Sequence, residues 1–126
     1  MMIECRYDHI HLMVGDPEGA AAWFCDHLGG QIVGRVASLD RPRIDVDLGG
    51  VRLFLSPYPG EGASSSERKR GIDHIAFAVA DVDRAAEVLS GRGVVILEPP
   101  SSSRPGTRTV FLQGPDNIRI ELLKRG

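Results

Sequence analysis

Two stretches of this 126-residue chain, DHIHLMVGD at residues 8–16 and DHIAFAVAD at residues 73–81, repeat one another. Both begin with Asp-His-Ile, and five of the nine positions are identical. The repeated histidines, His9 and His74, lie 65 residues apart, which is about half the chain. A repeat at this spacing indicates two copies of one structural module, one in each half of the chain.

Each copy of the repeat has the period-two pattern of a strand, with one face of mostly bulky apolar residues opposite the repeated histidine. A helix follows in both halves, because Asp16 and Asp81 are placed as N-caps, Pro17 opens the first helix and Gly29 ends it. Each half is therefore predicted to be β-α-β-β-β. The further strands are expected at 31–37, 43–49 and 51–56 in the first half, and at 94–99, 107–113 and 117–123 in the second.

These elements predict one domain over residues 1–126, made of a module at 5–56 and a module at 71–124. The polar segment 57–70 is predicted to be a linker, and 98–108, rich in Ser and Pro, a flexible loop.

Composition excludes several functions. A net charge of −2 gives no basic field, so no nucleic-acid partner is expected. There is no apolar run long enough for a membrane span and no signal-peptide pattern at the N-terminus, so a cytoplasmic location is expected. Cys5 and Cys25 should then stay reduced.

Strand alternation also predicts where the chemistry lies. If the apolar rows pack on the helices, His9, His74, Phe54 and Glu121 all face the open side of their sheets. Two modules packed with those sides together would form one cleft.

The repeated HIxxxVxD strand, the helix end WFCDHLGG and the closing GPDNIRIELL resemble the vicinal oxygen chelate superfamily. That superfamily includes glyoxalase I, extradiol dioxygenases, fosfomycin-resistance enzymes and bleomycin-binding proteins. The resemblance implies an α+β fold of two βαβββ modules with mixed sheets forming a cleft. It also implies His9, His74 and Glu121 as metal ligands, with Phe54 at the position where glyoxalase I has a fourth.

Two imidazoles and one carboxylate suit a divalent iron, manganese, nickel, cobalt or zinc ion. Three protein ligands leave coordination positions open for a small-molecule substrate with vicinal oxygens, as in extradiol dioxygenases. His11, on the face of His9, is the candidate for proton transfer, although a supporting role is equally compatible with its place. Phe54 and Arg119 are candidates for the substrate pocket, and a surface salt bridge is the other interpretation of Arg119.

Three alternatives stay open at this stage. The enzyme could be a non-oxidative lyase, isomerase or thiol transferase of the glyoxalase or fosfomycin-resistance kind. The chain could instead be a metal-free protein that binds a drug or metabolite, as in the bleomycin-binding branch. A homodimer is expected, and the cleft could then be formed within one chain or across two.

Overall fold

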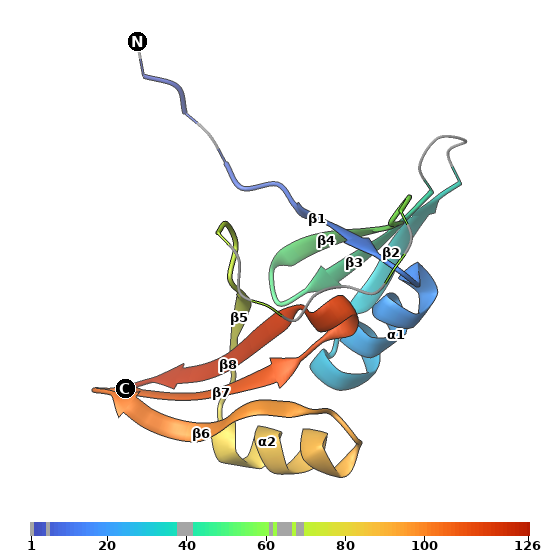
Figure 1. The fold of residues 1–126 in the computed structure, drawn as a ribbon. Coiled ribbons are helices and arrows are strands. Elements are labelled where there is room, and N and C mark those ends of the chain that lie inside the picture. The colour runs from blue at the N-terminus through green and yellow to red at the C-terminus, as the bar shows by residue number, and fades with distance from the viewer. Residues whose placement is uncertain (1, 5, 38–41, 61, 63–66, 68–69) are drawn as a thin grey trace. The chain divides into compact units, whose positions relative to one another are not determined.

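The structure is a computed structural model that describes residues 2–4, 6–37, 42–60, 62, 67 and 70–126 (Figure 1). Its contacts divide the chain into two compact units, Met1–Gly62 and Ala63–Gly126, each of which is described by itself. Several residues of the expected linker (61, 63–66 and 68–69) and Cys5 lie outside the described residues. Cys25 has a free thiol.

The first unit contains one helix and a four-stranded mixed sheet in the order β1-β4-β3-β2 (Figure 1). β1 pairs in parallel with β4, whereas β3 pairs antiparallel with β4 and with β2. The helix packs against β2, β3 and β4. The elements are β1 (Ile10–Val14), α1 (Pro17–Leu28), β2 (Gln31–Val36), β3 (Arg43–Leu48) and β4 (Val51–Pro57).

Helix α1 begins and ends where its capping residues predict. The Asp16 carboxylate accepts a hydrogen bond from the Gly19 amide, and Pro17 needs no amide partner in the first turn. Gly29 closes the helix in the left-handed conformation, with φ of 76°. The helix carries Trp23 edge-on to Phe24, which is fully buried against the sheet.

The second unit repeats this arrangement, with a sheet in the order β5-β8-β7-β6. β5 and β8 are parallel, and the other pairs are antiparallel. Asp81 caps the helix by accepting a hydrogen bond from the Arg84 amide, and the helix packs against β6, β7 and β8. The elements are β5 (Ile75–Ala78), α2 (Val82–Gly91), β6 (Ile96–Arg104), β7 (Thr107–Gln113), a short 3₁₀ turn η1 (Pro115–Asn117) and β8 (Arg119–Arg125). The predicted βαβββ order is confirmed in both units.

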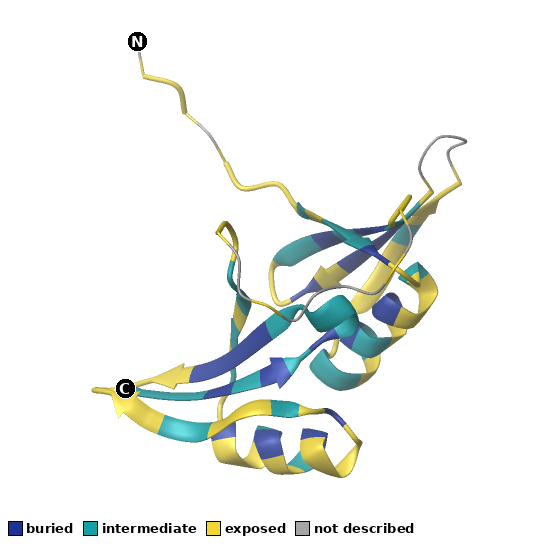
Figure 2. Cartoon of the chain, viewed as in Figure 1, coloured by how far each residue is buried: buried dark blue, intermediate teal, exposed yellow. Residues whose placement is uncertain are grey.

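Each sheet buries one face under its helix (Figure 2). Strand alternation puts the apolar rows on that face and a polar row on the other, so the histidine side of each sheet is free of its helix. The buried residues of the helix-covered faces are Val14, Ile44, Val46, Leu48, Leu53 and Leu55 in the first unit, and Val110, Leu112, Ile120 and Leu122 in the second.

Two sequence predictions about boundaries are wrong. The first strands begin at Ile10 and Ile75, so the repeated histidines lie immediately before the strands rather than within them. The expected loop 98–108 is a hairpin instead, with β6 running to Arg104 and a two-residue turn before β7. Pro99 and Pro100 are accommodated because β6 is an edge strand and its register with β7 shifts between Glu98 and Ser101.

No helix among the described residues has the length and apolar character needed to cross a bilayer.

Candidate metal centre

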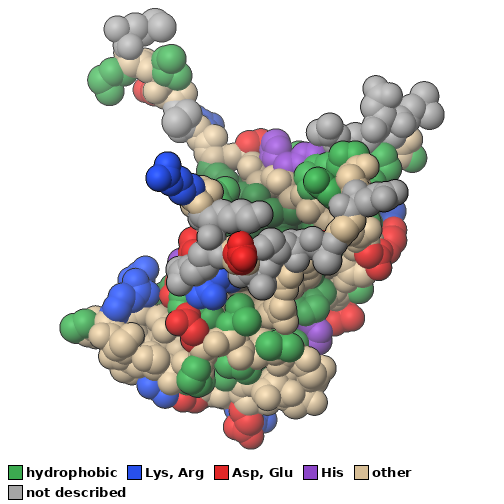
Figure 3. All heavy atoms as spheres, in the orientation of Figure 1, with side chains coloured by type: hydrophobic (Ala, Val, Ile, Leu, Met, Phe, Trp, Pro, Cys, Tyr) green, Lys and Arg blue, Asp and Glu red, His purple; other side chains and the backbone are tan. Residues whose placement is uncertain are grey.

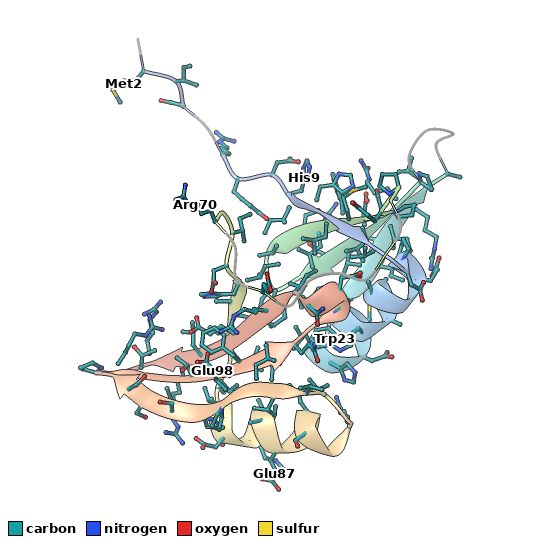
Figure 4. All side chains as sticks on the ribbon, in the orientation of Figure 1. Met2, His9, Trp23, Arg70, Glu87 and Glu98 are labelled. Atoms are coloured by element: carbon teal, nitrogen blue, oxygen red, sulfur yellow. The ribbon has the colours of Figure 1, made fainter. Side chains whose placement is uncertain are left out.

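The open face of the first unit carries a stack of three side chains around Phe54. The His9 ring stacks on Phe54, with centroids 4.0 Å apart, and the Arg43 guanidinium carbon lies 3.8 Å from the Phe54 centroid. Arg43 also donates hydrogen bonds of 2.7 and 3.2 Å to the two carboxylate oxygens of Asp45. Figure 4 places His9 at the start of β1, and Figure 3 shows histidine side chains at the surface over this strand. An aromatic ring therefore borders the first candidate ligand, and a cation contacts that ring.

His11 lies one position further along the same face. Its Nε2 is 2.8 Å from the Ser56 hydroxyl oxygen, and Ser56 is fully buried. The His9 and His11 rings are 6.4 Å apart, and Phe54 contacts both. The structure therefore places His11 beside the first candidate ligand, with its ring held by a buried hydroxyl.

In the second unit two of the candidate ligands come together. His74 Nε2 lies 3.5 Å from Glu121 Oε1, although the two residues are 47 positions apart in sequence, because β5 pairs with β8. Glu121 is only 4% exposed, and its other oxygen is 3.3 Å from the Arg104 guanidinium. Glu121 is thus a buried carboxylate whose partners are an imidazole and a cation.

The spacing of these two atoms fits a shared ion. Nitrogen and oxygen ligands each about 2.1 Å from a metal lie roughly 3.0 Å apart at an octahedral angle and 3.4 Å apart at a tetrahedral one. The observed 3.5 Å between His74 Nε2 and Glu121 Oε1 is close to this range. An imidazole with a carboxylate also suits divalent iron, manganese, nickel, cobalt or zinc.

The sheet registers relate Phe54 to Glu121. Phe54 on β4 is paired with His11 on β1, and Glu121 on β8 is paired with Ala76 on β5. Phe54 is therefore the first-unit counterpart of Glu121, and its ring has no atom that binds a metal. The second unit holds two candidate ligands, the first unit one.

Arg119 lies on the face of Glu121 and is engaged within its own sheet. It donates a 3.0 Å hydrogen bond to Glu98 and lies 4.7 Å from the centroid of the Phe111 ring. Figure 4 shows Glu98 on the β6–β7–β8 part of the sheet. The side chain is 18% exposed. The structure thus gives Arg119 an ion pair across the sheet. This agrees with the interpretation of Arg119 as a salt-bridge residue.

No group of three or more His, Cys, Asp and Glu side chains close enough to hold an ion occurs in the described parts of the chain. The expected ligands are divided between the two units. Sequence reasoning gave no role to Ser56 or Glu98, two side chains of the open faces, and predicted that Arg104 lies in a loop. It also passed over the aspartates that precede both histidines, although the repeat contains them.

Two units of the same βαβββ topology, each presenting a histidine ahead of its first strand, define a duplicated fold with its polar faces open. A family model of the Glyoxalase/Bleomycin resistance protein/Dioxygenase superfamily matches residues 6–122. The chain belongs to this superfamily.

Relatives of this chain cover it almost completely. It is 28% identical over 122 residues to the uncharacterized protein YwkD of Bacillus subtilis (strain 168), and 30% identical over 125 residues to the uncharacterized protein YaeR of Escherichia coli (strain K12). Both matches span 93% of this chain and 94% of the relative. Among solved structures, the fosfomycin resistance protein FosX of Listeria monocytogenes, complexed with Mn(II) and sulfate, superposes with a TM-score of 0.74. That match has 20% identity over 98% of this chain and 95% of FosX, and it shows the fold.

Proposed function

We propose that this chain is a divalent-metal-dependent enzyme acting on a small molecule with two neighbouring oxygen atoms. His9, His74 and Glu121 are the proposed ligands. The observation that carries the proposal is the approach of His74 Nε2 to the buried Glu121 carboxylate at 3.5 Å. A buried carboxylate is costly unless cations compensate it, and a divalent ion is one such cation.

The protein's own side chains divide the remaining tasks. His9, His74 and Glu121 would hold the ion, which would supply Lewis-acid stabilisation of an oxyanion on the substrate. Phe54 provides no fourth ligand and gives the substrate an apolar wall beside His9. His11, held by Ser56 at 2.8 Å, is the proposed residue for moving a proton at its imidazole nitrogens.

Within this class, the set of two histidines and one glutamate is most like that of extradiol-type dioxygenases. A non-oxidative lyase, isomerase or thiol transferase is the second candidate, supported by the fold shared with FosX, which was solved with Mn(II). Protein loaded anaerobically with Fe(II) and supplied with a panel of catechols separates the two. Oxygen uptake supports the dioxygenase, whereas turnover with Mn(II) and without oxygen supports the second candidate.

Metal binding itself tests the enzyme class. We expect protein purified without chelators to bind about one divalent ion per chain, measured by elemental analysis and by calorimetry with Mn(II). Glu121→Gln and His74→Ala should each abolish or strongly weaken binding because each removes a ligand. Glu87→Gln, which makes the same change in charge at an exposed site on α2, is the matched control.

Two results would contradict the proposed metal site. Absence of stoichiometric metal, or Mn(II) affinity unchanged in Glu121→Gln, would overturn the proposal. A metal-free protein that binds a drug or metabolite would then be the better description.

A further inference from the structure

Both candidate histidine ligands make the same contact with the residue that precedes them. His9 Nδ1 lies 2.6 Å from Asp8 Oδ2, and His74 Nδ1 lies 2.8 Å from Asp73 Oδ2. The contact occurs independently in the two units, and it accounts for the aspartate in each copy of the repeated Asp-His-Ile triplet. A carboxylate that accepts a hydrogen bond from Nδ1–H leaves the lone pair on Nε2.

In the second unit, the histidine that contacts the preceding aspartate also belongs to the candidate ligand pair. Nε2 is the His74 atom that lies 3.5 Å from Glu121 Oε1, so the tautomer with its proton on Nδ1, toward Asp73, is the one that leaves a lone pair for an ion between Nε2 and the carboxylate. The ring is also fixed from the side by Phe111, whose ring meets it edge-on at 5.2 Å. Asp73 and Phe111 together therefore orient the imidazole, and Asp73 alone contacts the nitrogen that decides its tautomer.

Asp73 lies near a cation and is partly buried, whereas Asp8 is largely in solvent. Arg119 Nε lies 3.8 Å from Asp73 Oδ2, and the same guanidinium donates a hydrogen bond to Glu98 at 3.0 Å. The Asp73 side chain is 34% exposed and that of Asp8 is 87% exposed. A contact screened by water contributes less than a partly buried one, so the two aspartates should differ in effect.

We infer that Asp73 and Asp8 are positioning residues that hold His74 and His9 with Nε2 available to a metal, and that Asp73 is the stronger of the two. Arg119 and Glu98 then act through Asp73, which gives Arg119 a role different from binding a substrate. The inference rests on the proposed function, since it names what the histidines are held for. Carboxylates that orient ligating histidines typically contribute about 10-fold to 100-fold to metal affinity.

The first test needs no metal. In ¹⁵N-labelled protein, long-range ¹H–¹⁵N correlation spectra report which ring nitrogen of His74 carries the proton. In a Glu121→Gln background, which removes the second carboxylate beside the ring, we expect the Nδ1–H form with Asp73 and also with Asp73→Asn, because the amide oxygen accepts the same hydrogen bond. Asp73→Ala should shift His74 toward the Nε2–H form. An unchanged tautomer in Asp73→Ala would overturn the inference.

The second test measures Mn(II) affinity by calorimetry. We expect Asp73→Ala to weaken Mn(II) binding about 10-fold to 100-fold relative to the wild type. Asp73→Asn and Asp8→Ala should each weaken binding less than Asp73→Ala does. Asp83→Ala, at an exposed site on α2, is the control and should leave the affinity unchanged. Equal affinity in the wild type and Asp73→Ala would overturn the inference and leave the proposed function standing.

The two failures are distinguishable. A wild type that binds no Mn(II) contradicts the proposed function, and the tautomer of His74 then still decides whether Asp73 sets the ring. If Asp73→Ala is unstable, Asp73→Asn keeps the size of the side chain, and its Mn(II) affinity, expected below that of the wild type, carries the test.

Discussion

Replacing Arg104 by methionine should strengthen metal binding rather than weaken it. The Arg104 guanidinium lies 3.3 Å from Glu121 Oε2, so in the metal-free protein it compensates a carboxylate that is only 4% exposed. The arginine is 59% exposed, which limits the pair to about 1 kcal/mol. In Arg104→Met the metal-free protein loses this compensation of Glu121. The bound metal ion provides the compensation in the metal-bound protein, so binding becomes more favourable.

The expected size of the effect follows from that limit. A change of about 1 kcal/mol corresponds to roughly fivefold tighter Mn(II) binding and to a fall of about 4 °C in the Tm of the metal-free protein. Calorimetric titration measures the first, and thermal unfolding with and without Mn(II) measures the second.

The control for this prediction is Arg108→Met, which removes the same charge from a side chain paired with Asp83. It should not change the Mn(II) affinity, since Asp83 is on α2 and not on the open face. Weaker binding in Arg104→Met together with an unchanged Tm of the metal-free protein would refute the reasoning. Such a result would mean that Arg104 orients Glu121 for the ion and does not take the place of the ion in the metal-free protein.

Three further predictions concern stability. Phe24→Ala should lower the free energy of unfolding, measured in urea, by about 3–5 kcal/mol because the ring is fully buried. A decrease of less than about 1 kcal/mol would contradict the packing described. Phe54→Leu should lower stability by roughly 1 kcal/mol through loss of the stack with His9, and an unchanged unfolding midpoint would argue against that stack. Hydrogen bonds from Arg108 hold the pKa of Asp83 below its ordinary value, so this stabilisation is present above the ordinary pKa and is lost as the pH falls through the lowered one. The Tm difference between Asp83→Asn and the wild type should therefore shrink in acid, and a pH-independent difference would contradict this assignment.

The helices could be located from sequence because their end signals are local. Asp16 and Asp81 bond to amides three residues ahead, and Gly29 needs only its own backbone conformation. The hairpin at 98–108 was missed for the opposite reason. Pro99 and Pro100 resemble a loop locally, and only the pairing of β6 with β7 at the edge of the sheet makes that stretch a strand.

The candidate site was partly predictable for a similar reason. Alternation along a strand and the repeat put His74 and Glu121 on one face, and the structure brings their side chains together. Arg104 and Glu98 reach this face through the shifted register of β6, which depends on contacts distant in sequence. The aspartates before the histidines had a signal in the repeat, but their hydrogen bonds depend on side-chain orientation, which sequence alternation does not specify.

Trp23 gives the molecule a built-in optical reporter. It is the chain's single tryptophan, and it lies in α1, 5.3 Å from Phe24 and from the His27 ring (Figure 4). Its fluorescence therefore reports on the unit that contains it, whereas far-ultraviolet circular dichroism records the backbone of both units. Coincident transitions by the two probes would mean that the halves of this duplicated protein unfold as one cooperative body, and separate transitions would mean that each half keeps its own stability.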